Sequence, residues 1–197
     1  MKNRHLQELI DRLKPHDYRA IEEELETQSS ETLVALLDAT SAKVGDTAAT
    51  LLRQRKEISL LIDACVNSRI RSARGRVRCM FVFNSSGLSA PETVAAYLHL
   101  LGDRSADVVY GALFGIVFAR RRDLLPTLRE RLGCLPAGSP RREDFSEAIK
   151  ALEANDPSLF SPGFFDAGNV WRLNEPAPPY TGEGKLEMDG KGEKTDG

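Results

Sequence analysis

The sequence predicts an all-helical protein made of stacked antiparallel helix pairs. Through most of residues 1–155, apolar side chains recur at three- and four-residue spacing, which is the period of an amphipathic helix. Residues 41–48 and 105–112 share the pattern Ser-Ala-x-Val-x-x-x-Ala, each after one apolar helix and at the start of another. Strand patterns are nearly absent. Two similar points in successive helix pairs indicate a repeated architecture, in which each pair buries its apolar face against the next.

The apolar stripes define the helices in chain order. Residues 6–13 carry one stripe that ends before Pro15, and residues 18–25 carry a second, so residues 1–28 are expected to form an N-terminal capping pair. Ser29 and Ser30 supply N-cap oxygens for the third helix. The apolar stretches of the later helices lie at residues 33–37, 44–52, 58–62, 70–81, 94–101, 105–120, 124–132 and 145–152.

Two of these elements need further justification. Residues 89–92, Ser-Ala-Pro-Glu, follow a clear break at residues 84–87 and form a capping box that starts the next helix. Residues 77–83 are rich enough in β-branched and aromatic side chains to be a strand. The helical pattern beside them favours a buried helix end.

The C-terminal region differs from the rest. We expect a helical-repeat domain over residues 1–156, an apolar segment over residues 157–173 that packs on the last helices, and a disordered tail over residues 174–197. Alternatively, the apolar segment is a short partner-binding motif anchored by Trp171. The fold class is therefore all-α with a mostly irregular C-terminal tail.

Charge is unevenly distributed along the chain. Residues 43–142 carry 17 Lys+Arg and 8 Asp+Glu, a balance of +9, whereas residues 143–197 carry 5 and 12, a balance of −7. One consequence is that the acidic C-terminal region could fold over the basic middle and mask it.

The helix pairs resemble the HEAT-repeat and armadillo-like superfamily. The resemblance rests on short turns with an acidic or amide residue, on a β-branched residue at the start of each second helix, and on a small residue four positions later. These residues are Asp38, Asn67 and Asp103; Val44, Ile70 and Val108; and Ala48 and Ala112. It covers about residues 30–155 and implies a right-handed solenoid of helix pairs. An irregular helical bundle is the alternative.

The sequence shows no pattern typical of catalysis. Its three histidines are scattered, its three cysteines have no metal-ligand or disulfide spacing, and no phosphate-binding glycine loop is present. We therefore expect no enzymatic activity, no cofactor and no metal. There is no stretch long enough to span a membrane, and the N-terminus has no apolar signal region, which predicts a cytoplasmic location.

Arginine clusters are the candidate binding site. Several lie close together in the basic middle, and others end the corresponding helix one repeat later, so they could form a basic ridge if the helices stack in register. Together with Trp171, the candidates are Arg69, Arg71, Arg74, Arg78, Arg120, Arg121 and Arg122. The guanidinium group recognises carboxylates and phosphates through its planar fork. Pairing with acidic residues of neighbouring turns is the structural alternative.

Two functions fit these observations. The first is a protein-interaction scaffold that binds an acidic partner protein, for instance a bacterial immunity-type inhibitor of a toxin. The second is binding of the nucleic-acid backbone in a basic groove, by similarity to HEAT-like DNA glycosylases. The overall net charge of −2 argues against the second.

Overall fold

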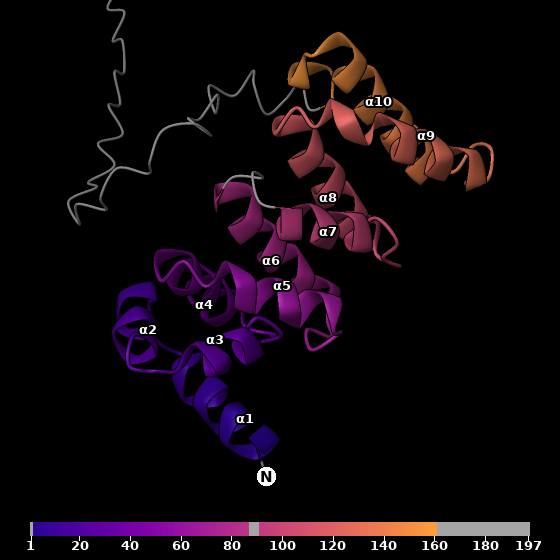
Figure 1. Cartoon of the computed structure of the whole chain (residues 1–197). Coiled ribbons are helices and arrows are strands. Elements are labelled where there is room, and N and C mark those ends of the chain that lie inside the picture. The colour runs from indigo at the N-terminus through magenta and orange to yellow at the C-terminus, as the bar shows by residue number, and fades with distance from the viewer. Residues whose placement is uncertain (1, 87–90, 161–197) are drawn as a thin grey trace, which may run out of the picture.

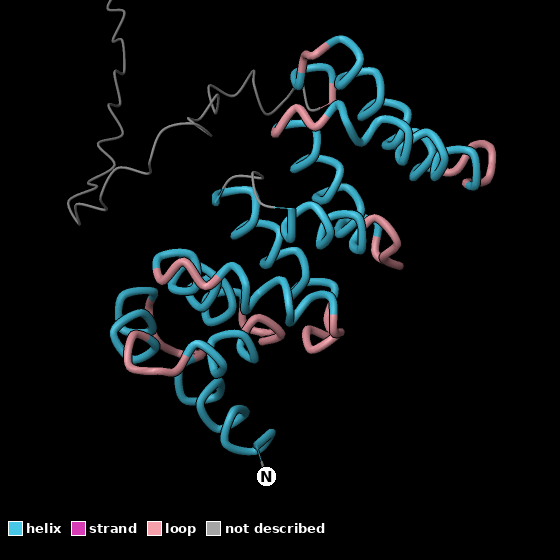
Figure 2. Tube along the Cα trace, viewed as in Figure 1, coloured by secondary structure: helices cyan, strands magenta, loops and turns pink. Residues whose placement is uncertain are grey.

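The computed structural model describes residues 2–86 and 91–160, and these residues form ten α-helices and two short 3-10 turns with no strand. Figure 1 shows the helices following one another along the molecule, from α1 at the bottom to α9 and α10 at the top, and Figure 2 shows the short loops that join them. The helices are α1 (Lys2–Leu13), α2 (Tyr18–Leu25), α3 (Ser30–Leu36), α4 (Ala42–Gln54), α5 (Ile58–Val66), α6 (Ala73–Ser86), α7 (Pro91–Leu100), α8 (Ala106–Phe118), α9 (Leu125–Cys134) and α10 (Pro140–Ala154). The 3-10 turns are η1 (Arg122–Leu124) and η2 (Pro157–Leu159).

The all-helical class is therefore confirmed for the described residues. Residues 77–83 lie within α6, so the strand alternative for them is wrong. No helix among the described residues is both long and apolar enough to cross a membrane.

Serine side chains start most of the even-numbered helices. Ser41 accepts a hydrogen bond from the backbone N–H of Val44, and Ser72 accepts one from Gly75 at 2.9 Å. Ser139 does the same at the start of α10. These bonds satisfy backbone donors that the first turn of a helix leaves without a partner. Ser105 makes no such bond, and its own N–H donates to the carboxylate of Asp103 at 2.8 Å instead.

The serines at the N-cap positions, which we call the capping serines, define a common register for α4, α6 and α8. The spacing is 31 residues from Ser41 to Ser72, 33 from Ser72 to Ser105 and 34 from Ser105 to Ser139. Seven positions after the first three serines stand Ala48, Cys79 and Ala112, each 0 % exposed. Small side chains at this shared position let neighbouring helices approach closely.

The prediction that a helix begins at Ile70 is wrong. Ile70 lies in the turn before α6, where its side chain is 2 % exposed, and the helix begins at Ala73. Gly75, not Ile70, therefore holds the position that corresponds to Val44 and Val108.

The core runs the length of the described chain. The even-numbered helices contact one another in succession, α2 with α4, α4 with α6, α6 with α8 and α8 with α10, and α4, α6, α8 and α10 each also pack on the odd-numbered helix that precedes them in the chain. Leucine, isoleucine, valine and alanine side chains fill the space between them.

The chain turns back after α10. Asn155 ends the helix in the left-handed conformation, with φ of 54°, and Asp156 accepts hydrogen bonds that start η2. Phe160 then packs on the fold and is 2 % exposed. This is the described part of the apolar segment predicted over residues 157–173; its residues 161–173, with Trp171, and the tail over residues 174–197 lie outside the described residues.

Candidate functional site

Aromatic side chains on α6 and α8 face outward at matching positions. The side chains five, nine and thirteen positions after each capping serine share one face of their helix, because these positions are four residues apart. On α6 and α8 they are mostly apolar. We call Val77, Phe81, Tyr110, Phe114 and Phe118 the aromatic face.

The aromatic face is partly open to solvent. Phe81 is 50 % exposed, Val77 37 % and Tyr110 36 %, and Phe114 and Phe118 are half-buried. The two half-buried rings stack on each other with centroids 4.0 Å apart. Apolar side chains that are exposed on two helices packed side by side mark an interaction site more often than an isolated exposed apolar residue does.

Contacts at its edges tie the aromatic face to neighbouring elements. The guanidinium carbon of Arg53, near the end of α4, lies 5.5 Å from the ring centroid of Phe81. At the other side, Phe160 stacks on Tyr110 with ring centroids 5.0 Å apart. The face therefore extends from the C-terminal end of α4, across α6 and α8, to the place where the described chain ends.

The sequence explains why this face exists. No charged residue occurs between Asp107 and Arg120, so α8 is apolar on every side, although α6, α7 and α10 cover only part of it. At the matching positions α4 carries Asp46, Thr50 and Gln54, and the surface becomes polar there.

Arg78 is a structural residue and not a surface ligand. Its side chain is 6 % exposed and its Nη1 donates to the carbonyl oxygens of Leu37 at 2.7 Å and Ala39 at 2.9 Å. The same guanidinium donates to the carbonyls of Ser41 and Ala42 and to the Asp46 carboxylate. It thus satisfies the carbonyls that the end of α3 leaves without an intrahelical donor.

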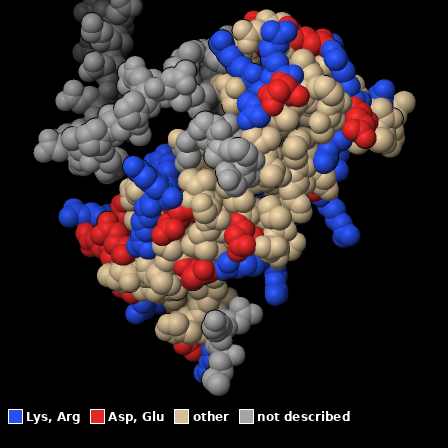
Figure 3. All heavy atoms as spheres, viewed as in Figure 1, with Lys and Arg blue, Asp and Glu red and all other residues tan. Residues whose placement is uncertain are grey.

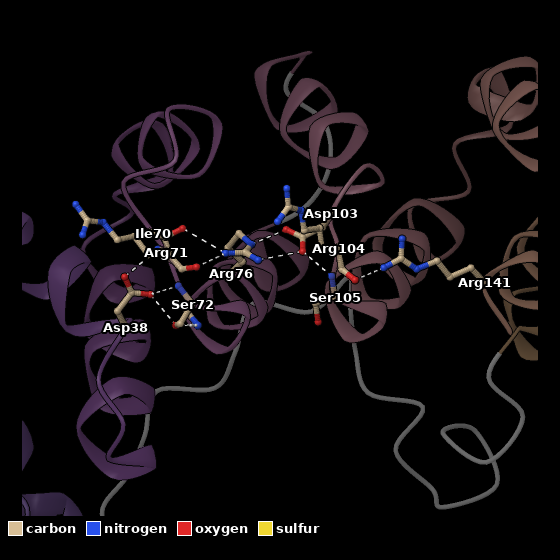
Figure 4. Close-up of polar contacts among 10 residues, drawn as sticks. Asp38, Ile70, Arg71, Ser72, Arg76, Asp103, Arg104, Ser105 and Arg141 are labelled. Carbon is tan, nitrogen blue, oxygen red and sulfur yellow. Dashed lines mark hydrogen bonds and ion pairs between the residues drawn. The ribbon is translucent and has the colours of Figure 1, made fainter. Parts of the chain in front are cut away.

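A chain of polar contacts joins successive turns, as Figure 4 shows. The Asp38 carboxylate accepts hydrogen bonds from the backbone N–H groups of Arg71 and Ser72, both at 2.9 Å. Arg76 donates to the carbonyl of Arg71 at 2.7 Å and, with two nitrogens, to the Asp103 carboxylate.

The next link in this chain is weaker. Arg141, at the start of α10, donates to the carbonyl of Arg104.

The pKa of Asp103 reflects its partners. Burial raises this pKa, but hydrogen bonds from Arg76 and from the backbone of Ser105 outweigh burial, so the pKa is lowered.

The other predicted arginines near α6 are divided between pairing and exposure. Arg69 is bound by Glu31 and by Asp63, whose Oδ2 lies 3.0 Å from its Nη1. Arg74 is exposed and donates to the carbonyl of Thr40 at 2.8 Å. Arg71 is exposed.

The predicted basic ridge does not form. Arg120, Arg121 and Arg122 follow the C-terminal end of α8, and Arg121 pairs with Asp123 at 2.7 Å. Arg71 and Arg74 lie instead at the N-terminal end of α6. Because α6 runs beside α8 in the same register, the two groups lie at opposite ends of helices that are about 20 Å long. Figure 3 shows Lys and Arg interspersed with Asp and Glu on the face in view.

A second surface feature is a cavity of about 430 Å³ beside α7, α9 and α10. Arg131, Cys134 and Arg141 contribute to its lining. Both arginines also hold backbone carbonyls, those of Leu98 and Arg104. Within residues 2–86 and 91–160, no group of three or more His, Cys, Asp or Glu side chains is placed to hold a metal ion.

Sequence reasoning missed the aromatic face. Its signal was available, since Tyr110, Phe114 and Phe118 are spaced four residues apart and Phe81 occupies the matching position nine residues after Ser72. Comparison with known proteins found no family model, no curated protein and no solved structure that matches this chain.

Proposed function

We propose that this chain is a non-enzymatic scaffold of HEAT-like helix pairs, arranged as a solenoid, that binds a partner protein through the aromatic face. The observation that carries the proposal is the exposure of Phe81 and Tyr110 on adjacent helices, with Arg53 lying over one of the rings. Aromatic and arginine side chains are enriched at the energetic centres of protein interfaces.

The arginines around this face favour a partner with an acidic surface. On α6, Arg74 lies one turn before Val77 of the aromatic face, and Arg71 lies in the turn that precedes the helix. Arg53 lies over Phe81, the next residue of the face along α6. A partner segment with an apolar anchor and flanking carboxylates would meet both kinds of side chain. An immunity-type inhibitor of a toxin is one protein of this class.

Nucleic-acid binding has less support. A basic groove needs several cationic side chains that reach the phosphate backbone together. Arg69, Arg76 and Arg78 are engaged by carboxylates or backbone carbonyls of the fold. Of the exposed arginines, Arg71 and Arg74 lie near each other at the start of α6, whereas Arg120 and Arg122 follow the opposite end of α8.

The test is recovery of a partner from nuclease-treated host lysate by the full chain and by three variants. We expect Phe81→Ala to weaken recovery and Phe81→Glu to weaken it further, because the new carboxylate repels an acidic partner. Val66→Glu is the matched control, since Val66 is 39 % exposed on α5 and lies outside the aromatic face. The free energy of unfolding should change by less than about 1 kcal/mol in each variant, as is usual for substitutions at exposed sites.

Two results would overturn the proposal. One is equal recovery of a stoichiometric partner by the wild type and both Phe81 variants. The other is recovery that disappears on nuclease treatment and falls steeply with salt, which would favour nucleic acid.

A further inference from the structure

The described chain ends on the aromatic face. After α10 the left-handed Asn155 and η2 redirect the backbone toward α8, and Phe160 stacks on Tyr110 at an interplanar angle of 23°. The residues that follow Phe160 therefore start beside an apolar surface that they can cover without a long connection.

The sequence after Phe160 has the composition to cover that surface. Residues 161–173 contain Phe164, Phe165, Val170 and Trp171. An extended chain spans at most about 3.3–3.6 Å per residue, so Phe164 reaches about 13 Å from Phe160 and Trp171 about 36 Å. Neighbouring helix axes lie about 8–10 Å apart. Phe164 and Trp171 are therefore both close enough along the chain to reach α8, and Trp171 is also close enough to reach Phe81 on α6.

Charge favours the same placement. Residues 161–197 carry 7 Asp+Glu and 4 Lys+Arg, a balance of −3. Arg53 lies over Phe81, and Arg74 donates to the carbonyl of Thr40 just before α4, so both lie toward α4, whereas Phe160 contacts α8. Within residues 161–173 the only charged residues are Asp166 and Arg172, so the negative balance lies in residues 174–197. If residues 161–173 cover the face from Phe160 toward α6, the acidic residues that follow them start near these arginines.

We propose that residues 161–173 dock on the aromatic face of their own chain, with Trp171 against α6, and that a partner protein must displace them. The docking itself is independent of the proposed function, whereas the competition rests on it. A covered face also keeps a large apolar surface from associating with other molecules until a partner with higher affinity arrives.

Trp171 reports directly on this docking, because it is the only tryptophan in the chain. In the wild-type full chain we expect its fluorescence to be blue-shifted relative to N-acetyltryptophanamide and protected from acrylamide. Phe81→Glu should weaken both effects, since loss of one phenylalanine contact lowers the docking constant by about tenfold or more. Val66→Glu should leave both effects unchanged.

Each contrary outcome has a distinct meaning. Wild-type emission and quenching equal to those of the free amide would overturn the docking. A blue shift that Phe81→Glu does not change would place Trp171 elsewhere. A blue shift that grows with protein concentration, with a dimer in sedimentation, would show docking on a second copy.

Competition is tested separately with the replacement of Phe164, Phe165 and Trp171 by serine in the full chain. We expect this variant to recover more partner than the wild type. Because the fluorescence experiment needs no partner, failure of the proposed function leaves it interpretable. Unchanged recovery together with a positive fluorescence result would overturn only the competition.

Discussion

Replacement of Arg78 tests how the turn between α3 and α4 is held. Arg78→Met keeps most of the aliphatic stem and removes the guanidinium, so the change isolates the five hydrogen-bond acceptors around it. The carbonyls of Leu37 and Ala39 are the acceptors in the buried part of this site. Methionine offers them no donor.

The magnitude follows from these two carbonyls. Leaving a buried acceptor without a donor costs about 1–3 kcal/mol. Water reaches the Asp46 side of the site, where the carboxylate is 54 % exposed, and replaces part of what is lost there. We therefore expect Arg78→Met to lower the free energy of unfolding by about 3–5 kcal/mol, which is a large share of the stability of a domain.

Urea unfolding followed by circular dichroism measures this change, provided that the free energy of unfolding falls with urea concentration at the same slope in the wild type and the variant. Arg74→Met is the matched control, because Arg74 is exposed and makes one hydrogen bond, to Thr40; its expected cost is below about 1 kcal/mol. Arg78→Lys should lie between the two, since a single ammonium cannot span all five acceptors. A cost below about 1 kcal/mol for Arg78→Met would refute the structural role.

Two further changes probe the same polar framework. Gly45→Ala places a Cβ 2.1 Å from the guanidinium carbon of Arg78. Because the hydrogen-bond acceptors hold this guanidinium in place, we expect the free energy of unfolding to fall by about 2 kcal/mol. In the Arg78→Met background the same substitution should cost much less, and additive losses in a double-mutant cycle would contradict this contact. The pKa of Asp103 is lowered in the folded state, so its contribution to stability is present above the unfolded-state pKa and is lost as pH falls through the folded-state value. Unfolding measured from neutral to acidic pH should show this loss in the wild type and not in Asp103→Asn, and parallel pH profiles would exclude it.

The sequence predicts the helices better than it predicts their register. The pattern at Ser41 and Ser105 marks true helix starts, but it does not identify the equivalent Ser72, because Ile70 and Arg71 resemble the first residues of a helix. Ile70 is apolar because it packs into the core from within a turn, and a linear pattern does not distinguish that from a helix position.

The prediction of a basic ridge is wrong for a related reason. A run of arginines shows where positive charge lies along the chain, whereas its acceptors are backbone carbonyls that become adjacent only after folding. The carbonyls of Leu37 and Ala39 are about forty residues from Arg78 in the sequence and have no side-chain signature. Likewise, α6 and α8 are rich in apolar residues on several sides, so their sequences alone do not show which side is left open.

The chain of polar contacts between turns also bears on how the molecule deforms. Directional bonds resist sliding of one helix past another, which apolar contacts permit. Between α4 and α6 the contacts include Arg78, Arg74 and Asp38; between α6 and α8 the Arg76–Asp103 pair; and between α8 and α10 the exposed bond from Arg141. We therefore expect the α4–α6 interface, which has several such bonds, to resist sliding of its helices. Under load, we expect the α4–α6 interface to keep its shape, because its helices cannot slide without breaking these bonds.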